Sequence, residues 1–193
     1  TFWATISCAF PTIWPEFGVA RDYPTGNVPQ AQAKADLNGD GHLDLVVSNQ
    51  GNNSVSVRLG SGTGTFGAEA FYAVGTNPAN INVADYNEDG KLDLAVANFS
   101  SSNLSILLGV GDGTFGARTN FLCGASPFEI AKGDFNADGH LDLAVTNRDA
   151  NSYSVLLGTG TGSFGAATTV AVGNNPRGIT SCDLNEDGKL DLV

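Results

Sequence analysis

The sequence predicts an all-β fold of tandem repeats, namely a β-propeller of four-stranded antiparallel blades with about 49 residues per blade. One offset predicts the repeats, because Asp36, Asp85, Asp134 and Asp183 each lie 49 residues after the one before. Within each period, apolar and polar residues alternate, which is the pattern of strands. Repeats of this length are typical of propellers with four strands per blade.

The same offset holds at other positions that shape turns. It relates Pro29, Pro78, Pro127 and Pro176, the glycines Gly60, Gly109 and Gly158, and the Phe-Gly pairs that begin at Phe66, Phe115 and Phe164. These registers divide the chain into units 29–77, 78–126 and 127–175, with a split unit formed by 176–193 and 1–28. The chain of about four blades is therefore one propeller domain or a fragment of a propeller.

Four strands are expected in each unit, and in the first complete unit they lie near 30–35, 43–49, 54–59 and 69–74. Val55, Val57 and Leu59 alternate with polar residues in the third of these. The joints carry residues that accept positive φ angles, namely Asp40-Gly41, Asn52-Asn53 and the glycine-rich run 60–64.

The two ends of the chain complement each other in this register. Residues 5–10 align with strand three and Phe17-Gly18 with the later Phe-Gly pairs, whereas the last unit stops after strand two. Pairing of Thr5–Tyr23 with Leu190–Val193 in one shared blade would close a ring, within one chain or between chains of an oligomer. A fragment of a longer array is the alternative, since propellers have about 4 to 8 blades.

Charge and composition exclude several classes of partner. The formal net charge is -11 and the pI is about 4.2, so nucleic acid is disfavoured. No segment has the roughly 20 apolar residues of a membrane span. Cys8, Cys123 and Cys182 lack CxxC spacing and are expected to be free thiols.

The repeated acidic segments predict calcium loops in the hairpin between strands one and two. Each has Asp, Asn, Asp, Gly and Asp at positions 1, 3, 5, 6 and 9, and the four read DLNGDGHLD (36–44), DYNEDGKLD (85–93), DFNADGHLD (134–142) and DLNEDGKLD (183–191). Calcium prefers six to eight oxygen ligands, which alternate side chains of a tightly curled loop can supply. Three to four Ca²⁺ ions are expected.

The expected ligands are side-chain oxygens at positions 1, 3, 5 and 9 and the backbone carbonyl at position 7. The side-chain ligands are Asp36, Asn38, Asp40, Asp44, Asp85, Asn87, Asp89, Asp93, Asp134, Asn136, Asp138, Asp142, Asp183, Asn185, Asp187 and Asp191; the carbonyls belong to His42, Lys91, His140 and Lys189. Because His and Lys interchange at position 7, solvent-exposed side chains are expected there, without a zinc or catalytic role. An ordinary Asx-turn would explain one such loop, but four in phase with a ninth-position Asp favour metal.

These loops, followed by NxxSVxLLGxGxGTFG, resemble the FG-GAP repeats, also called VCBS or integrin-α-like repeats. The resemblance covers nearly the whole chain. It implies a propeller with calcium loops on one face, as in integrin α-chain heads, a fungal sugar-binding lectin and many secreted bacterial proteins. It therefore implies an extracellular, secreted or cell-surface location.

Recognition by binding is the function expected, with a carbohydrate or protein ligand. No nucleophile-elbow or HExxH pattern occurs, so no enzymatic activity is expected. Hairpin geometry places the loops between strands two and three, and between blades, on the face opposite the calcium loops. Their variable positions predict ligand-binding residues, namely Gln50, Phe99, Phe128, Arg148 and Arg177, although ordinary loop variation would also explain them. A structural spacer array of a larger secreted protein is the alternative function.

Overall fold

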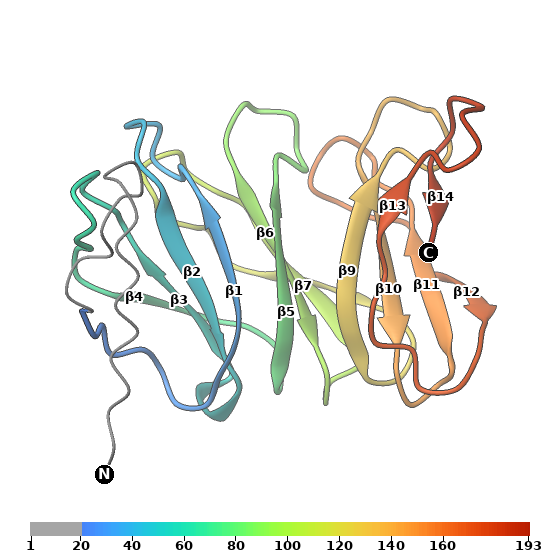
Figure 1. Cartoon of the computed structure of the whole chain (residues 1–193), viewed down its shortest axis with the longest axis horizontal. Helices are drawn as coiled ribbons and strands as arrows, with labels where there is room; N and C mark the ends of the chain where they lie inside the picture. The colour runs from blue at the N-terminus through green and yellow to red at the C-terminus, as the bar shows by residue number, and fades with distance from the viewer. Residues whose placement is uncertain (1–20) are drawn as a thin grey trace, which may run out of the picture.

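The computed structural model describes residues 21–193 and shows an all-β arrangement of stacked antiparallel sheets (Figure 1). The first sheet contains β1 (Pro29–Ala35), β2 (Asp44–Asn49), β3 (Ser54–Arg58) and β4 (Ala70–Ala73), with the short 3-10 helix η1 (Gln50–Asn52) between β2 and β3. The second contains β5 (Pro78–Ala84), β6 (Asp93–Asn98), β7 (Asn103–Leu107) and β8 (Thr119–Leu122). The third contains β9 (Pro127–Gly133), β10 (Asp142–Asn147), β11 (Ser152–Leu156) and β12 (Thr168–Ala171), and a hairpin of β13 (Ser181–Cys182) and β14 (Asp191–Leu192) follows.

Each sheet is a meander in which sequential strands are neighbours, as propeller blades require. The strand predictions for the first unit are confirmed to within two residues at each boundary. The turn predictions are also confirmed, because Asn53, Gly41, Gly62 and Gly64 all have positive φ. The fourth unit contains two strands in the described part of the chain, as the register predicts.

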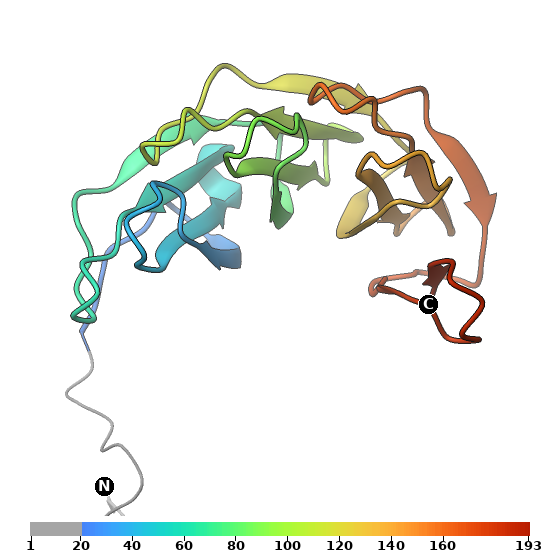
Figure 2. The same ribbon diagram turned by 90° about the horizontal axis from the view of Figure 1, so that it is seen from above.

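The blades stack side by side along an open arc (Figure 2). The first strands of consecutive blades are neighbours on its concave side: Asn82 Nδ2 donates to the Ile130 carbonyl at 3.2 Å, and Ser181 Oγ to the Lys132 carbonyl at 2.8 Å. Strands β4, β8 and β12 lie on the convex side. The predicted closure through residues 5–23 lies almost wholly outside the described residues; of that segment, Tyr23 contacts the first blade.

The hydrophobic core lies between blades rather than within them. One cluster joins the first and second blades through residues such as Val46, Val57 and Leu94, and another joins the second and third through Leu104 and Leu143. These side chains come from the middle strands, whose alternation presents one row to each neighbouring blade. A blade therefore depends on the next blade to bury its apolar face.

The repeated Phe-Gly pairs belong to these inter-blade contacts. Three edge-to-face pairs recur at the same place, with ring centroids 5.3 to 5.4 Å apart: Tyr23–Phe66, Tyr72–Phe115 and Phe121–Phe164. In the second and third pairs, strand four of one blade supplies the first ring and the next blade supplies the phenylalanine. Phe115 and Phe164 are buried, so packing is their role.

Of the three cysteines, Cys123 and Cys182 are free thiols, as expected, and Cys8 lies outside the described residues. Burial raises the pKa of the Cys123 thiol to about 12, so this thiol is protonated at neutral pH. Within residues 21–193, no helix is long and apolar enough to cross a membrane.

Candidate functional site

The four acidic loops connect the first and second strands of successive units and share one face of the arc (Figure 1). This face also carries the glycine-rich turns between strands three and four. Local sequence explains the reversal in each loop, because position 6 has a φ of 82° to 90°, a conformation that glycine adopts without a steric cost. Those glycines are Gly41, Gly90, Gly139 and Gly188.

The side-chain oxygens of positions 1, 3 and 5 accept backbone amides of the same loop and so hold it in a tight curl. In the first loop, Asp36 Oδ2 accepts the Gly41 amide at 2.8 Å, and Asn38 Oδ1 accepts the Asp40 amide at 3.1 Å. Asp40 Oδ1 then accepts the amide of position 7 at 2.8 Å. The equivalent bonds recur in the other three loops. Each of these side-chain oxygens keeps a second lone pair.

In the first three loops the aspartate at position 9 is buried, unlike those at positions 1 and 5. Asp93 Oδ2 accepts the Tyr86 amide at 2.9 Å, and its Oδ1 accepts the Gly109 amide at 2.8 Å. Asp44 and Asp142 make the same two bonds in their blades. This carboxylate therefore joins the acidic loop to the end of strand three.

Glycine is required where strand three ends, because the backbone passes close to the acidic loop. A Cβ added at Gly109 would lie 2.2 Å from the Leu92 carbonyl oxygen, and Gly60 and Gly158 are equally restricted. These glycines recur every 49 residues because each donates its amide to the position-9 aspartate of its own blade at this close approach. The burial of this aspartate is what distinguishes the loop from a simple Asx-turn.

The loop residues fit calcium in the kind of atom they offer. The sequence of each loop contains three aspartates and one asparagine besides the carbonyl of position 7, and calcium prefers such hard oxygen ligands. The pKa of Asp93 is raised by burial, and the nearby charges of Asp85 and Asp89 raise it further. Within residues 21–193, no three carboxylate, imidazole or thiol groups lie together as a metal cluster.

The side chains at position 7 differ among the loops. His42 is exposed, as predicted. His140 is instead half-exposed, because its Nδ1 lies 2.6 Å from Glu88 Oε1 in the loop of the preceding blade. His140 is therefore less exposed than expected, and the hydrogen bond and charge of Glu88 raise its pKa. Sequence reasoning missed this pair because the two residues are 52 positions apart.

The loop backbone also contains a conformation that the sequence did not indicate. Position 4 has positive φ in every loop, although it is glycine only at Gly39; the others are Glu88, Ala137 and Glu186. Residues other than glycine adopt this region at a steric cost, which the hydrogen bonds of the loop must offset. At Glu88 this backbone carries the carboxylate that contacts His140.

The opposite face gathers four of the five predicted ligand-binding residues. The rings of Phe99 and Phe128 are edge to face with centroids 6.5 Å apart. The Arg148 guanidinium lies 4.4 Å from the Phe99 ring centroid, and that of Arg177 lies 6.0 Å from the Phe128 centroid. We call these four residues the Arg-Phe row. Gln50, the fifth predicted residue, lies in η1 of the first blade and outside the row.

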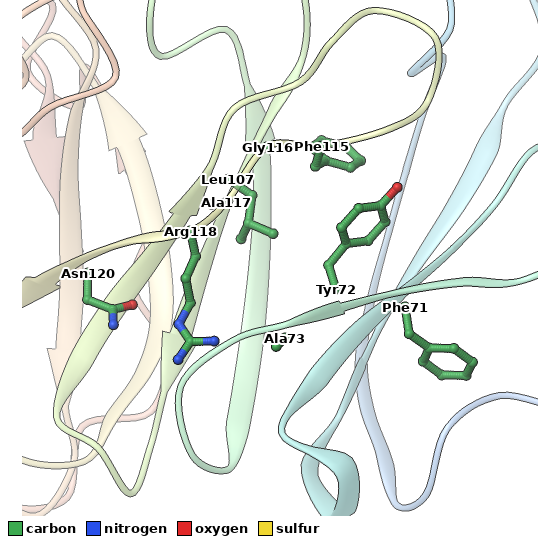
Figure 3. A pocket seen from close by; sticks show the side chains of 9 residues that line it. All are labelled: Phe71, Tyr72, Ala73, Leu107, Phe115, Gly116, Ala117, Arg118 and Asn120. Atoms are coloured by element: carbon green, nitrogen blue, oxygen red, sulfur yellow. The ribbon is translucent and has the colours of Figure 1, made fainter.

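The convex rim has grooves between neighbouring blades. The groove between the first and second blades has a volume of about 620 Å³, and Figure 3 shows Arg118 and Leu107 on one side of it and Tyr72 and Phe71 on the other. The groove between the second and third blades has about 460 Å³. It repeats the first with other side chains, since Asn120 replaces Phe71 and Ala167 replaces Arg118.

Blades of this form with an acidic DxNxDG hairpin on each define a propeller-like repeat protein. The sequence model of the FG-GAP-like repeat matches residues 36–96, 85–145 and 134–193, and the chain therefore belongs to this family. The resemblance proposed from the loops is thus confirmed. No curated protein matches the sequence.

Several solved structures share the fold at low sequence identity. A lectin of Agrocybe aegerita, described as specifically recognising non-reducing terminal N-acetylglucosamine, is 21% identical with a TM-score of 0.57, covering 83% of this chain and 46% of the lectin. BBS1N, solved in complex with ARL6DN, is 16% identical with a TM-score of 0.56, covering 82% and 48%. The Tc holotoxin pore of Photorhabdus luminescens is 18% identical with a TM-score of 0.51, covering 86% of this chain and 8% of the toxin chain. The chain spans less than half of each of these proteins.

Proposed function

We propose that this protein is a calcium-binding recognition module that acts without catalysis, and that its ligand is a carbohydrate or a protein. The observation that supports it best is the Arg-Phe row, which joins residues from three successive units on the face opposite the acidic loops. Arg177 is exposed and the other three residues of the row are partly exposed, and accessible arginine and aromatic side chains are common in binding surfaces. The acidic loops would then stabilise the blades and take no part in ligand binding.

Calcium would be held by the oxygens of positions 1, 3, 5 and 9 and by the backbone carbonyl of position 7. Its charge would offset the carboxylates of each loop, which otherwise repel one another. The buried aspartate would transmit that effect to the blade, because it already joins the loop to strand three. Calcium thus stiffens the scaffold that presents the opposite face.

The comparisons support a binding role in general terms. The similar structures include one described by its recognition of N-acetylglucosamine and one solved in a protein complex. An extracellular or cell-surface location suits both the family resemblance and weak calcium sites, since extracellular modules bind at about 10⁻⁴ to 10⁻³ M. The Arg-Phe row is where this proposal places the ligand.

A glycan array together with a protein-capture screen, each run with calcium and with chelator, tests this function. We expect a ligand for the wild type whose binding is lost in Phe128→Ala and weakened by chelator. Phe71→Ala, which removes an exposed phenylalanine from the rim, is the matched control and should bind normally. Binding that survives Phe128→Ala but fails when Asp89 is replaced by Ala would place the ligand on the calcium face instead.

A structural spacer array is the second candidate, and one observation favours it. Every contact of the Arg-Phe row joins one unit to another, so the row also holds blades together. Ring closure through the split blade, within the chain or in an oligomer, belongs to this alternative too. Light scattering of the purified protein would distinguish monomer from oligomer, and absence of any ligand in the screen would favour the spacer.

A further inference from the structure

The Arg-Phe row contains two pairs in which an arginine lies over a phenylalanine ring. Arg148 lies 49 residues after Phe99, and Arg177 lies 49 residues after Phe128, so each arginine occupies the place in its own repeat that the phenylalanine has in the preceding one. Each guanidinium consequently covers the ring of the preceding unit. One repeat earlier, the places of Phe99 and Phe128 are taken by Gln50 and Ala79, so the pair of rings does not occur there.

The two guanidiniums keep donors available for a ligand. Arg177 is exposed and has no acidic partner among residues 21–193. Arg148 donates from Nε to Asp149 Oδ1 at 3.1 Å, and in the described part of the chain no hydrogen bond engages its two Nη atoms. A guanidinium stacked on a ring still directs its N–H groups outward in its own plane, where a carboxylate can accept two of them.

These features favour an anionic ligand at this place. The chain has 9 basic and 20 acidic residues, yet two of those basic residues, Arg148 and Arg177, lie in this row, each over a phenylalanine ring of the preceding unit. A ligand that carries more than one carboxylate can engage both guanidiniums. A large acidic protein would place much of its negative charge near this protein, whose net charge is -11, and would be repelled. A thin polymer strand would contact mainly the Arg-Phe row, so most of its charge would lie beyond the screening distance of the other acidic residues.

Resting on the recognition function proposed above, we infer that the Arg-Phe row binds a strand of carboxylated polysaccharide, with one uronate carboxylate at each arginine. Phe99 and Phe128 hold the guanidiniums in place and offer apolar edges to the sugar rings. Asp149 weakens the site by competing for Arg148, so its removal strengthens the binding of a carboxylate. A row that only holds blades together has no such dependence.

The probe is a hyaluronan tetrasaccharide, which has two glucuronates, with its carboxyl-reduced form as the neutral counterpart. Titration calorimetry should show binding of the acidic form alone, weakening with salt. Arg148→Gln and Arg177→Gln should each lower affinity about tenfold, as expected for a lost charge-assisted hydrogen bond. Asp149→Asn should raise affinity several-fold, and Arg118→Gln, the same charge change on the rim, should have no effect.

Each other outcome contradicts the inference in its own way. Equal binding of the carboxyl-reduced sugar, or an equal loss in Arg118→Gln, would show that the row does not read carboxylates. Binding of an oligoglutamate peptide in place of the uronate would make the partner an acidic protein. If the screen finds a neutral glycan or a protein at the row, the recognition function stands and only the uronate assignment falls. Asp149→Asn keeps the test decisive if an arginine variant unfolds.

Discussion

The aspartate at position 9 connects the acidic loop to its blade in each of the three complete units. Asp93 is buried, and each of its carboxylate oxygens accepts one backbone amide, from Tyr86 and from Gly109. The aspartates at positions 1 and 5 instead face solvent or lie near it and bond only within their own loop. Aspartate thus has two roles in this motif: the buried one joins the loop to the blade, and the more exposed ones shape the loop itself.

Asp93→Asn is expected to lower the free energy of unfolding by about 1 to 3 kcal/mol, because the amide turns an NH₂ group toward one of two buried N–H donors. Urea denaturation in chelator measures this loss. Asp89→Asn is the control, since this more exposed side chain keeps an acceptor after the change, so its stability without calcium should be unchanged while calcium affinity falls. Equal stability of the two variants would refute the structural role of Asp93.

At the scale of elements, neighbouring blades are joined by contacts that repeat with the chain. The edge-to-face pair of Tyr72 and Phe115 lies in the core between the first and second blades. On the face of the acidic loops, the Gly162 amide of the third blade donates to the Tyr86 carbonyl of the second blade at 2.9 Å. The blade interface is therefore fixed at its rim, its core and its loops, and each join can be tested separately.

Phe115→Ala should destabilise the protein by about 3 to 5 kcal/mol, because it leaves a cavity between two blades that cannot close without moving a sheet. The unfolding midpoint in urea provides the measurement. Val110→Ala, at a half-exposed position of the same turn region, should change stability by less than about 0.5 kcal/mol. A comparable loss in both variants would mean that the turn, and not the inter-blade pair, sets stability.

The contact between Glu88 and His140 predicts that the stability of the interface between the second and third blades depends on pH. The pKa of His140 is raised above 6.5, so the pair stabilises the fold fully below that pH and the effect is lost as pH rises through the folded pKa. In Glu88→Gln the NMR titration midpoint of His140 should therefore move down toward 6.5. Its stability deficit relative to wild type should be larger at about pH 5.5 than at about pH 8. An unchanged midpoint would show that the two side chains do not meet in solution.

Across the whole molecule, stability is shared by units that each contact mainly their neighbours. The described units form an open arc, and four acidic loops lie along one face of it. For the calcium binding proposed above, only the folded loop would gather the ligands, so ion binding and folding would be linked.

Calcium should raise the melting temperature, since a site with a hundredfold excess of ion over its Kd contributes about 2.7 kcal/mol. Differential scanning fluorimetry with added calcium and with chelator measures the shift. Asp89→Ala should reduce the shift partially, because the other loops keep their ligands. A melting temperature that does not respond to chelator would exclude calcium as a stabilising ligand.

The sequence by itself determined the period, the strands, the turns and the face on which each loop lies. All of these follow from short-range rules, since alternation fixes a strand and Gly90 in DYNEDGKLD fixes a reversal within a few residues. The free state of Cys123 and Cys182 was also predictable. Gly109 could be recognised as repeated, but its contact with Leu92 could not.

Only the tertiary structure decided which side chains meet across blades. Arg148 over Phe99 and His140 beside Glu88 join residues about 50 positions apart, and their distance depends on the angle at which one blade stacks on the next. That angle comes from the packing of many apolar side chains between the sheets, which no local pattern encodes. The same packing decides that Asp93 is buried while Asp89, four residues earlier, faces solvent.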